Sequence, residues 1–432
     1  MQNRNLVLAL LLSMLLFSFS GIGQNNTSSP YSRFGIGDLS AQGFGRNKAM
    51  GGTGIALRSN YTLNNVNPAS YTAMDSMSFI LEFGVKAGFS QFKTNAVDKS
   101  QNNSDFNFDY LAFAFPITRW WGTSFGVLPI SDVGYEINTT GSVTVEGSPI
   151  KTGFRFTGEG GMTKAYWSNG FKLHRNLSVG LGMNYVFGTL DFTREIGFED
   201  PSFASLKLTE KAQIRDLLFD FGVQYHGKIN SKYDLTVGAI YRKKTKLDAD
   251  YENLVTKTEI VPDGKGGSTG RTREISSSDV DRVVDLPDTY GIGFAVTKNK
   301  KLTLAFDYTH QKWSDARFLR RNDTLVNSNN FALGMEYTPN ANSIRSYFHR
   351  IRYRFGAHFD NTYLKVRNKQ LQDYGLSIGA GLPFKKNGSY INVAFEVGRR
   401  GTLNNNLIRE DYAKISVNFS LFEHWFVKRK FD

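Results

Sequence analysis

Alternation of apolar and polar residues dominates most of this chain. From Met77 to Phe89 the odd-numbered positions are apolar, and the even-numbered positions between them are polar, charged or glycine except at Ile80. A period of two places alternate side chains on opposite faces of a β-strand. This stretch therefore predicts a strand with one apolar and one polar face.

The same period recurs and predicts about 14 strands, an even number as in bacterial membrane barrels. In a soluble sandwich the apolar face would form the core, whereas in a membrane barrel it faces lipid and the polar face lines the lumen. We predict an all-β fold, a transmembrane antiparallel β-barrel. After the first strand, the others are expected at 111–117, 121–127 (resuming at 133–137), 163–173, 177–187, 217–225, 233–241, 290–296, 302–308, 331–337, 351–359, 374–382, 391–397 and 413–419.

Connections of two lengths separate the predicted strands, as in barrels with short periplasmic turns and long outer loops. Short ones lie at 174–176, 298–301 and 385–388. Residues 242–286, with PDGKGGSTG at their centre, are predicted as a polar, mobile loop. The other long connections are 93–105, 138–160, 190–213, 310–328, 338–350, 360–372 and 398–410.

The segment before the first strand lacks this period. Residues 43–70, GFGRNKAMGGTGIALRSNYTLNNVNPAS, are too rich in glycine and asparagine for a helix and too short of alternation for a strand. Gly51 and Gly52 permit close chain approaches, and Pro68 biases Asn67 to an extended conformation. We expect an irregular plug. On the predicted strand 374–382, glycines at 375, 379 and 381 share one face, where they would leave room for backbone or ligand.

The plug resembles the N-terminal hatch of the FadL-type family, outer-membrane transporters of long-chain fatty acids and other hydrophobic molecules. Three motif residues are Met50, Gly51 and Gly52, and three more follow about fifteen residues later at Asn67, Pro68 and Ala69. Stretches beginning at Gly158 and Asp285, and the region 354–384, are also similar to that family. The resemblance implies a 14-stranded barrel whose lumen is plugged by the hatch.

Four segments are expected along the chain. Residues 1–23 have the basic start, apolar core and small residues of a signal peptide, and the core is shorter than the roughly 20 residues of a spanning helix. The hatch is expected at 24–75 and the barrel at 76–420. Residues 421–432 form a tail, either a periplasmic handle for a partner or a continuation of the last strand.

Composition agrees with an exported barrel. Mean hydropathy is −0.34, but only alternate strand residues face lipid, and the chain has 14% aromatic residues, 42 glycines and 10 prolines. The net charge is +13, but the sequence has no clustered basic helix of the kind found in nucleic-acid binders. The positive charge therefore suits outer loops near lipid phosphates or an ordinary solvated surface. Without cysteine there is no disulfide, thiolate metal site or acylated lipoprotein.

Motifs for catalysis are missing. The six histidines form no HExxH pattern, and there is no GxSxG elbow or P-loop. Asp105, Asp109, Asp216 and Asp220 have the spacing of lumen-facing polar residues rather than of paired catalytic acids. We expect no enzyme, no cofactor and no metal.

A proline in the third predicted strand marks a candidate opening. In the FadL-type family a kink in this strand opens the wall to the outer leaflet, so Pro129, Ile130 and Ser131 are candidates for a lateral exit. Proline removes a ladder donor and should break or kink the strand, although a bulge or strand-end turn would explain it equally well.

Hatch side chains are candidates for the rest of the substrate path. An alkyl chain gains about 0.8 kcal/mol per buried methylene, so a dry pocket opening into lipid suits it better than a watery channel. Phe34, Phe44 and Tyr61 could line such a pocket, or merely seat the plug. Cations that could pair with a carboxylate headgroup are Arg33, Arg46 and Lys48.

The resulting hypothesis is a passive outer-membrane transporter of hydrophobic, fatty-acid-like molecules, in contact with outer-membrane lipid. The alternative is a protein-interaction barrel, because the family resemblance also reaches a shuttle of the type IX secretion system. Its partner would be a periplasmic or secretion-system protein. Nucleic acid is not expected as a partner.

Overall fold

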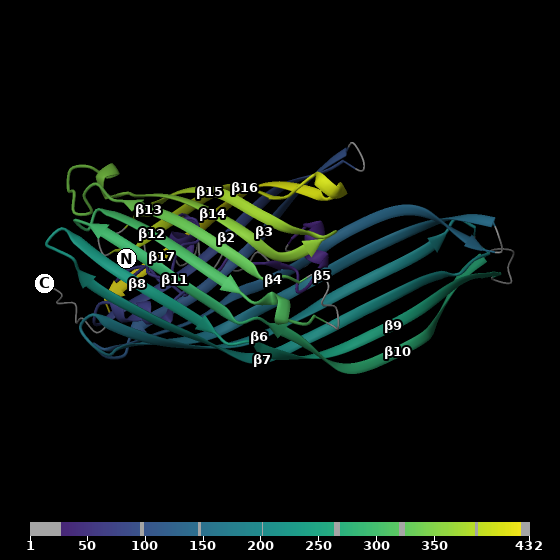
Figure 1. The fold of residues 1–432 in the computed structure, drawn as a ribbon, viewed down its shortest axis with the longest axis horizontal. Helices are drawn as coiled ribbons and strands as arrows, with labels where there is room; N and C mark the ends of the chain where they lie inside the picture. Colours follow the sequence, from purple (N-terminus) through teal and green to yellow (C-terminus); the bar gives the residue numbers. More distant parts are fainter. Residues whose placement is uncertain are drawn as a thin grey trace, which may run out of the picture.

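A closed antiparallel β-barrel forms most of the molecule (Figure 1). The computed structural model describes residues 27–95, 99–145, 148–200, 202–262, 268–318, 325–384 and 388–424. In these ranges no helix has the length and apolar content needed to cross a membrane. The helices in these ranges are short: η1 (Pro30–Arg33), α2 (Gly45–Lys48), η2 (Pro68–Ala73), η3 (Trp313–Asp315), η4 (Phe348–Arg350) and η5 (Asn404–Asn406).

The strands follow one another around the barrel, apart from the two-residue β1 (Asp38–Leu39). They are β2 (Ser78–Thr94), β3 (Lys99–Pro116), β4 (Trp121–Val145), β5 (Ser148–Lys172), β6 (Leu177–Phe198), β7 (Ser205–Lys228), β8 (Tyr233–Arg242), β9 (Thr245–Pro262), β10 (Ser268–Leu286), β11 (Thr289–Lys298), β12 (Leu302–Gln311), β13 (Ser328–Tyr337), β14 (Arg352–Val366), β15 (Lys369–Pro383), β16 (Tyr390–Gly401) and β17 (Ile408–His424).

Two barrel strands are each made of two segments. β7 pairs with β8 near the short turns and with β9 further out, so β9 continues the line of β8. In the same way β10 pairs with β9, and β11 with β8. Counting β8 with β9 and β10 with β11, the barrel has 14 strands, and β17 closes it against β2. The predicted antiparallel 14-stranded barrel is confirmed.

Apolar side chains cover the outside of this barrel. On β11, for example, buried and exposed residues alternate from Thr289 to Ala295. Because the apolar face points outward, it meets lipid rather than a protein core. Exposed apolar residues lie on strands all around the barrel, including Phe89, Phe125, Trp167, Leu181, Phe219, Tyr241, Ile292, Phe306, Leu333, Phe355, Ile378, Phe395 and Ile415.

Several connections predicted as loops are strands instead. Residues 242–286 were expected to be a mobile loop, but 245–262 and 268–286 are the paired strands β9 and β10, and residues 263–267 lie outside the described ranges. Much of 93–105, 138–160 and 190–213 is also strand. Cross-strand ion pairs such as Arg273–Glu259 (2.7 Å) and Arg155–Glu136 (3.2 Å) line these extensions. Strands that leave the membrane can be polar on both faces, which removes the period of two while the backbone ladder persists.

The outer parts of β4 to β7, β9 and β10 (133–145, 148–160, 191–198, 205–214, 245–262 and 268–286) will be called the protruding sheet. Figure 1 shows these strands reaching well beyond β12 to β17. The last strand is also longer than expected: β17 runs to His424, so the barrel does not end at residue 420 and the tail does not begin at 421. The predicted signal peptide (1–23) and residues 425–432 lie outside the described ranges.

Candidate functional site

Residues 27–75, the N-terminal segment, lie inside the barrel. Their backbone donates hydrogen bonds to wall residues on separate strands, from Gly51 N to Ser377 Oγ on β15 (3.0 Å) and from Gly54 N to Asp307 Oδ2 on β12 (2.6 Å). Asn67 Nδ2 reaches Val223 O on β7 (3.1 Å). Residues 43–70, where no helix was expected, contain the short helix α2 and the start of η2, whereas η1 and β1 lie before that stretch.

The motif Asn67, Pro68, Ala69 begins one of these turns, η2. Asn67 Oδ1 accepts a hydrogen bond from Ala69 N (3.1 Å), and its Nδ2 donates to Ile55 O (2.9 Å). Pro68 suits the first position of a helical turn because its missing N–H would have no partner there. The motif therefore turns the chain and ties two parts of the N-terminal segment together.

The motif Met50, Gly51, Gly52 sits against the wall. Met50 is fully buried, and Gly51 and Gly52 have φ values of +67° and +89°. A Cβ on Gly51 would lie 2.6 Å from the backbone nitrogen of Ala357 on β14. Only glycine permits this approach.

Glycines on the inner face of the barrel wall also make room for the N-terminal segment. A Cβ on Gly356 would lie 2.0 Å from Gly51 N, and one on Gly379 would lie 2.6 Å from Ala49 Cβ. The predicted role of Gly379 in making room is thus confirmed, whereas Gly375 faces His358 and Gly381 faces Arg354. Similar close approaches to the N-terminal segment occur at Gly122, Gly170, Gly180, Gly222, Gly238 and Gly334.

A buried ionic cluster joins the segment to β13 and β14. Arg46 binds Glu336 through two hydrogen bonds (2.8 and 3.1 Å), and Arg354 Nε donates to the same carboxylate (2.7 Å). Arg352 lies 3.5 Å from it. Lys48 pairs with Asp109 of β3. Arg46 and Lys48 are therefore already neutralised by the wall, unlike the free headgroup-binding cations that the sequence suggested.

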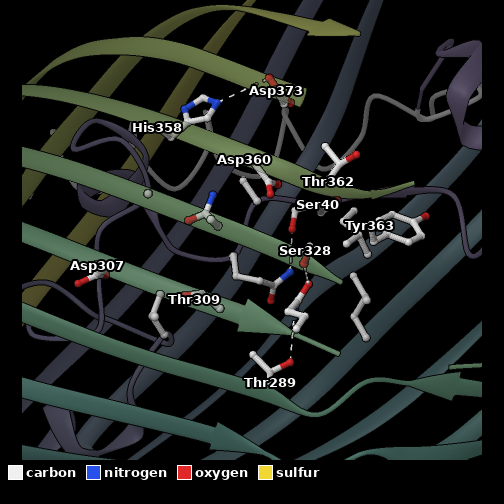
Figure 2. Close-up of a pocket in the computed structure, with 18 of the residues that line it drawn as sticks. Ser40, Thr289, Asp307, Thr309, Ser328, His358, Asp360, Thr362, Tyr363 and Asp373 are labelled. Carbon is white, nitrogen blue, oxygen red and sulfur yellow. Dashed lines mark hydrogen bonds and ion pairs between the residues drawn. The ribbon is translucent and has the colours of Figure 1, made fainter. Parts of the chain in front are cut away.

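A cavity of about 360 Å³ remains between the N-terminal segment and the wall. Its walls carry both polar and apolar groups, and Figure 2 shows the polar residues Ser40, Asp307, Thr309, Ser328, Asp360 and Thr362 around it. Apolar parts come from Leu39, Ile130, Leu218, Ile240, Leu286 and Trp313. The cavity therefore combines an apolar lining with carboxylates and hydroxyl groups.

Asp38 anchors the segment at one side of the cavity. Its Oδ1 accepts from Arg400 Nη1 of β16 (3.0 Å), and Arg400 Nε also donates to Asp373 (3.2 Å). Burial raises the pKa of Asp38 to about 6, although the charge of Arg400 acts in the opposite direction. Asp373 in turn pairs with His358 at 3.7 Å, as Figure 2 shows.

The wall separates between β3 and β4. Their pairing runs from Pro116↔Gly122 to Leu111↔Val127 and stops there, while β3 continues along β2 and β4 along β5. Pro129 does not break β4, contrary to one expectation. The chain shifts register between Pro129 and Ser131, the bulge that was the alternative.

The N-terminal segment covers β4 beyond this separation. Leu39 of β1 pairs with Ser131, Ser40 N donates to Ile130 O (2.8 Å), and Gln42 Nε2 reaches Pro129 O (3.5 Å). Ile130 also lines the cavity, with Ser40 and Gln42. Residues 38–42 therefore lie between the cavity and the separation of the two strands.

The three aromatic candidates of the N-terminal segment do not line the cavity. Phe44 is fully buried and stacks on Tyr110 with 4.0 Å between ring centroids. Tyr61 packs under the Arg352 guanidinium at 4.1 Å. Phe34 packs against an apolar cluster in the outer lumen, which includes Tyr31, Ile36, Trp313 and Phe318. Sequence reasoning missed Asp38, Gln42 and Lys164, which line the cavity and carry no motif.

This architecture defines the class of protein: an outer-membrane barrel with the fold of FadL-family hydrophobic-compound channels. Solved structures that share the fold include the Pseudomonas putida toluene transporter TodX (TM-score 0.60, 18% identity, 91% of this chain and 100% of that chain). The Ralstonia pickettii toluene transporter TbuX has a TM-score of 0.58 and 15% identity over 88% of this chain and 98% of that chain. A Pseudomonas aeruginosa FadL homologue has a TM-score of 0.53 and 12% identity over 90% of this chain and 99% of that chain.

The family model described as BamG matches residues 4–432, and the chain belongs to that family. No curated protein sequence matches the chain. At identities of 12% to 18%, the likeness to solved structures concerns the fold.

Proposed function

We propose that the protein is a passive outer-membrane transporter of hydrophobic molecules, in which the N-terminal segment acts as a hatch and cargo leaves sideways between β3 and β4. The main support for this proposal is that β3–β4 pairing ends at Leu111↔Val127 and that residues 38–42 cover β4 beyond this last pair. The solved structures with the same fold include toluene transporters. No step of this function requires a catalytic group.

Lateral exit solves a solvation problem. Each buried methylene of a cargo molecule is worth about 0.8 kcal/mol, so release into water would be opposed and release into lipid would not. Few contacts hold residues 38–42 of the hatch against β4 at the strand separation. They consist of the short β1–β4 pairing and the hydrogen bonds of Ser40 and Gln42, which a modest displacement of residues 38–42 would break.

A disulfide across these contacts tests the proposal. Leu39 and Ser131 face each other in the β1–β4 register, and the chain has no cysteine of its own. The double variant Leu39→Cys, Ser131→Cys should lose uptake of labelled long-chain fatty acid when oxidised and regain it after reduction, because the hatch can no longer leave β4. Uptake is measured in cells whose own copy of the protein is deleted.

The matched control joins two wall strands without touching the hatch. Leu181→Cys with Phe221→Cys links β6 to β7 at facing positions on the outer surface and should leave uptake unchanged in both redox states. Wild-type uptake by the oxidised hatch variant would show that cargo does not need the hatch to move.

The protruding sheet favours a second candidate, a protein-interaction barrel. Its first strand, β4, pairs only with β5 beyond residue 134, and its last strand, β10, pairs with β9 along its length. Unpaired strand edges can accept an added strand from another chain. Because the long connections lie on the outer side of the membrane, the partner at this sheet would be a secretion-system protein rather than a periplasmic one.

A further inference from the structure

Five lysine and arginine side chains line the cavity, and four of them have a carboxylate partner. Lys48 pairs with Asp109 and Arg242 with Asp220. Arg400 pairs with Asp38 and Asp373, and Lys414 lies 3.7 Å from Glu396. The fifth is Lys164.

Lys164 differs in having no carboxylate within ion-pair distance. It points inward from β5, only 5% of its surface is exposed, and within the described ranges it makes no hydrogen bond or ion pair. The carboxylate of Asp220, on β7, is occupied by Arg242 Nε (2.5 Å) and Asn184 Nδ2 (3.0 Å). The ammonium group of Lys164 therefore shares the charge of this one carboxylate with Arg242, without a hydrogen bond to it, and two cations face a single anion here.

A buried ammonium group without a hydrogen-bonded anion is destabilising. An anion in the cavity would remove that cost and gain a charge-assisted hydrogen bond. The opposite wall would not hold the anion, since Asp307 on β12 and Asp360 on β14 each have a side-chain oxygen without a hydrogen-bond partner. Negative charge in the cavity is thus directed towards β5.

Lys164 also lies at the edge of the strand separation. Its cross-strand neighbour is Leu128, the residue directly after the last β3–β4 pair at Val127. We propose that Lys164 binds the oxyanion headgroup, carboxylate or phosphate, of a small amphipathic cargo whose apolar part lies towards the separation. That the ligand is cargo rests on the proposed function, whereas the binding site itself does not.

Binding to the full-length protein in nanodiscs tests this, with hexanoate, hexyl phosphate, 1-hexanol and hexylammonium as probes in isothermal titration. Hexanoate or hexyl phosphate should bind at least about tenfold more tightly than 1-hexanol and hexylammonium. Lys164→Met should weaken binding of the anion about 10- to 100-fold, the range expected for a hydrogen bond to a charged group. Tighter binding of hexanoate would identify a carboxylate headgroup, and tighter binding of hexyl phosphate would identify a phosphate headgroup.

Two variants serve as controls. Lys164→Arg keeps the charge and should retain binding, and Lys414→Met removes a cavity lysine that is already paired and should change anion binding little. Heat-modified electrophoretic mobility verifies that each barrel is folded. Equal binding of hexanoate, hexyl phosphate and 1-hexanol by the wild type, or undiminished anion binding by folded Lys164→Met, would overturn the inference. Uptake of neutral hydrophobic cargo would then still decide the proposed function separately.

Discussion

At the scale of single residues, Glu336 is the centre of the contact between the N-terminal segment and the wall. It is buried against Arg46, Arg352 and Arg354, and Arg354 itself is almost fully enclosed. The carboxylate therefore compensates several cations that have left water. Breaking such a buried group by removing one partner is far more costly than deleting an exposed pair.

Glu336→Gln should accordingly lower the free energy of unfolding by about 3–5 kcal/mol, because it leaves three buried guanidinium groups without their counter-charge. Urea-induced unfolding of the refolded barrel measures this. Glu136→Gln is the matched control, since the Arg155–Glu136 pair is half exposed and should contribute at most about 1 kcal/mol. Similar losses for both variants would contradict the assigned role of Glu336.

None of these pairs was readable from the sequence. Arg46 and Glu336 are separated by 290 positions, and an alternating pattern states only that Glu336 and Arg354 face the lumen. Which lumen-facing charges meet depends on how the N-terminal segment folds into the bore. The same applies to Lys164, whose lack of an ion-pair partner is a property of its surroundings.

At the scale of elements, the strands and the N-terminal segment fit because glycines on the wall face backbone in the bore. Gly356 on β14 makes the closest approach, to Gly51. Glycine weakens an ordinary strand, but it is required where another backbone comes this near. The motif and the wall glycines are two halves of one contact.

Gly356→Ala should therefore displace residues 43–56 while leaving the strand ladder intact, because a Cβ would lie 2.0 Å from Gly51 N. Hydrogen exchange should show faster exchange of these amides and unchanged protection in β14. Gly197→Ala serves as the control, since its nearest neighbour would be Ser205 Oγ at 3.9 Å. Unchanged exchange in Gly356→Ala would mean that the segment is not held by this contact.

Element positions followed from the sequence where one face meets lipid and the other the lumen, as on β11 and β13. The prediction failed for β9 and β10, because their ion-paired outer parts meet water on both faces. Pro129 illustrates another limit. The lack of a backbone donor at proline is compatible with either a kink or a bulge. Only the pairing of β4 with β5 shows that a bulge forms.

At the scale of the whole molecule, the barrel carries two separable surfaces, the cavity with its strand separation and the protruding sheet. The cavity receives only Leu286 from β9 and β10. The buried residues of this hairpin, such as Tyr251 and Val284, lie near its base. Its outer half can therefore be removed without altering the cavity.

Deleting residues 255–276 and joining Leu254 to Ser277, which face each other, through a two-residue turn should leave a folded barrel with wild-type fatty-acid uptake. Heat-modified mobility and the uptake assay measure this. The second candidate function is tested by comparing the surface proteins of cells that carry the deletion variant with those of cells that carry the wild type. Retained uptake with unchanged surface proteins favours the transporter, and loss of surface proteins with unchanged uptake would favour the interaction barrel.

The sequence by itself determined the barrel, the positions of the strand parts that face lipid and the motifs that hold the N-terminal segment, because the period of two and the glycine requirement are local properties of the chain. Tertiary structure alone decided where β3 and β4 part, which charges neutralise each other and why Lys164 remains unpaired. These outcomes depend on contacts between residues far apart in the chain, and a cavity exists only after all such contacts have formed.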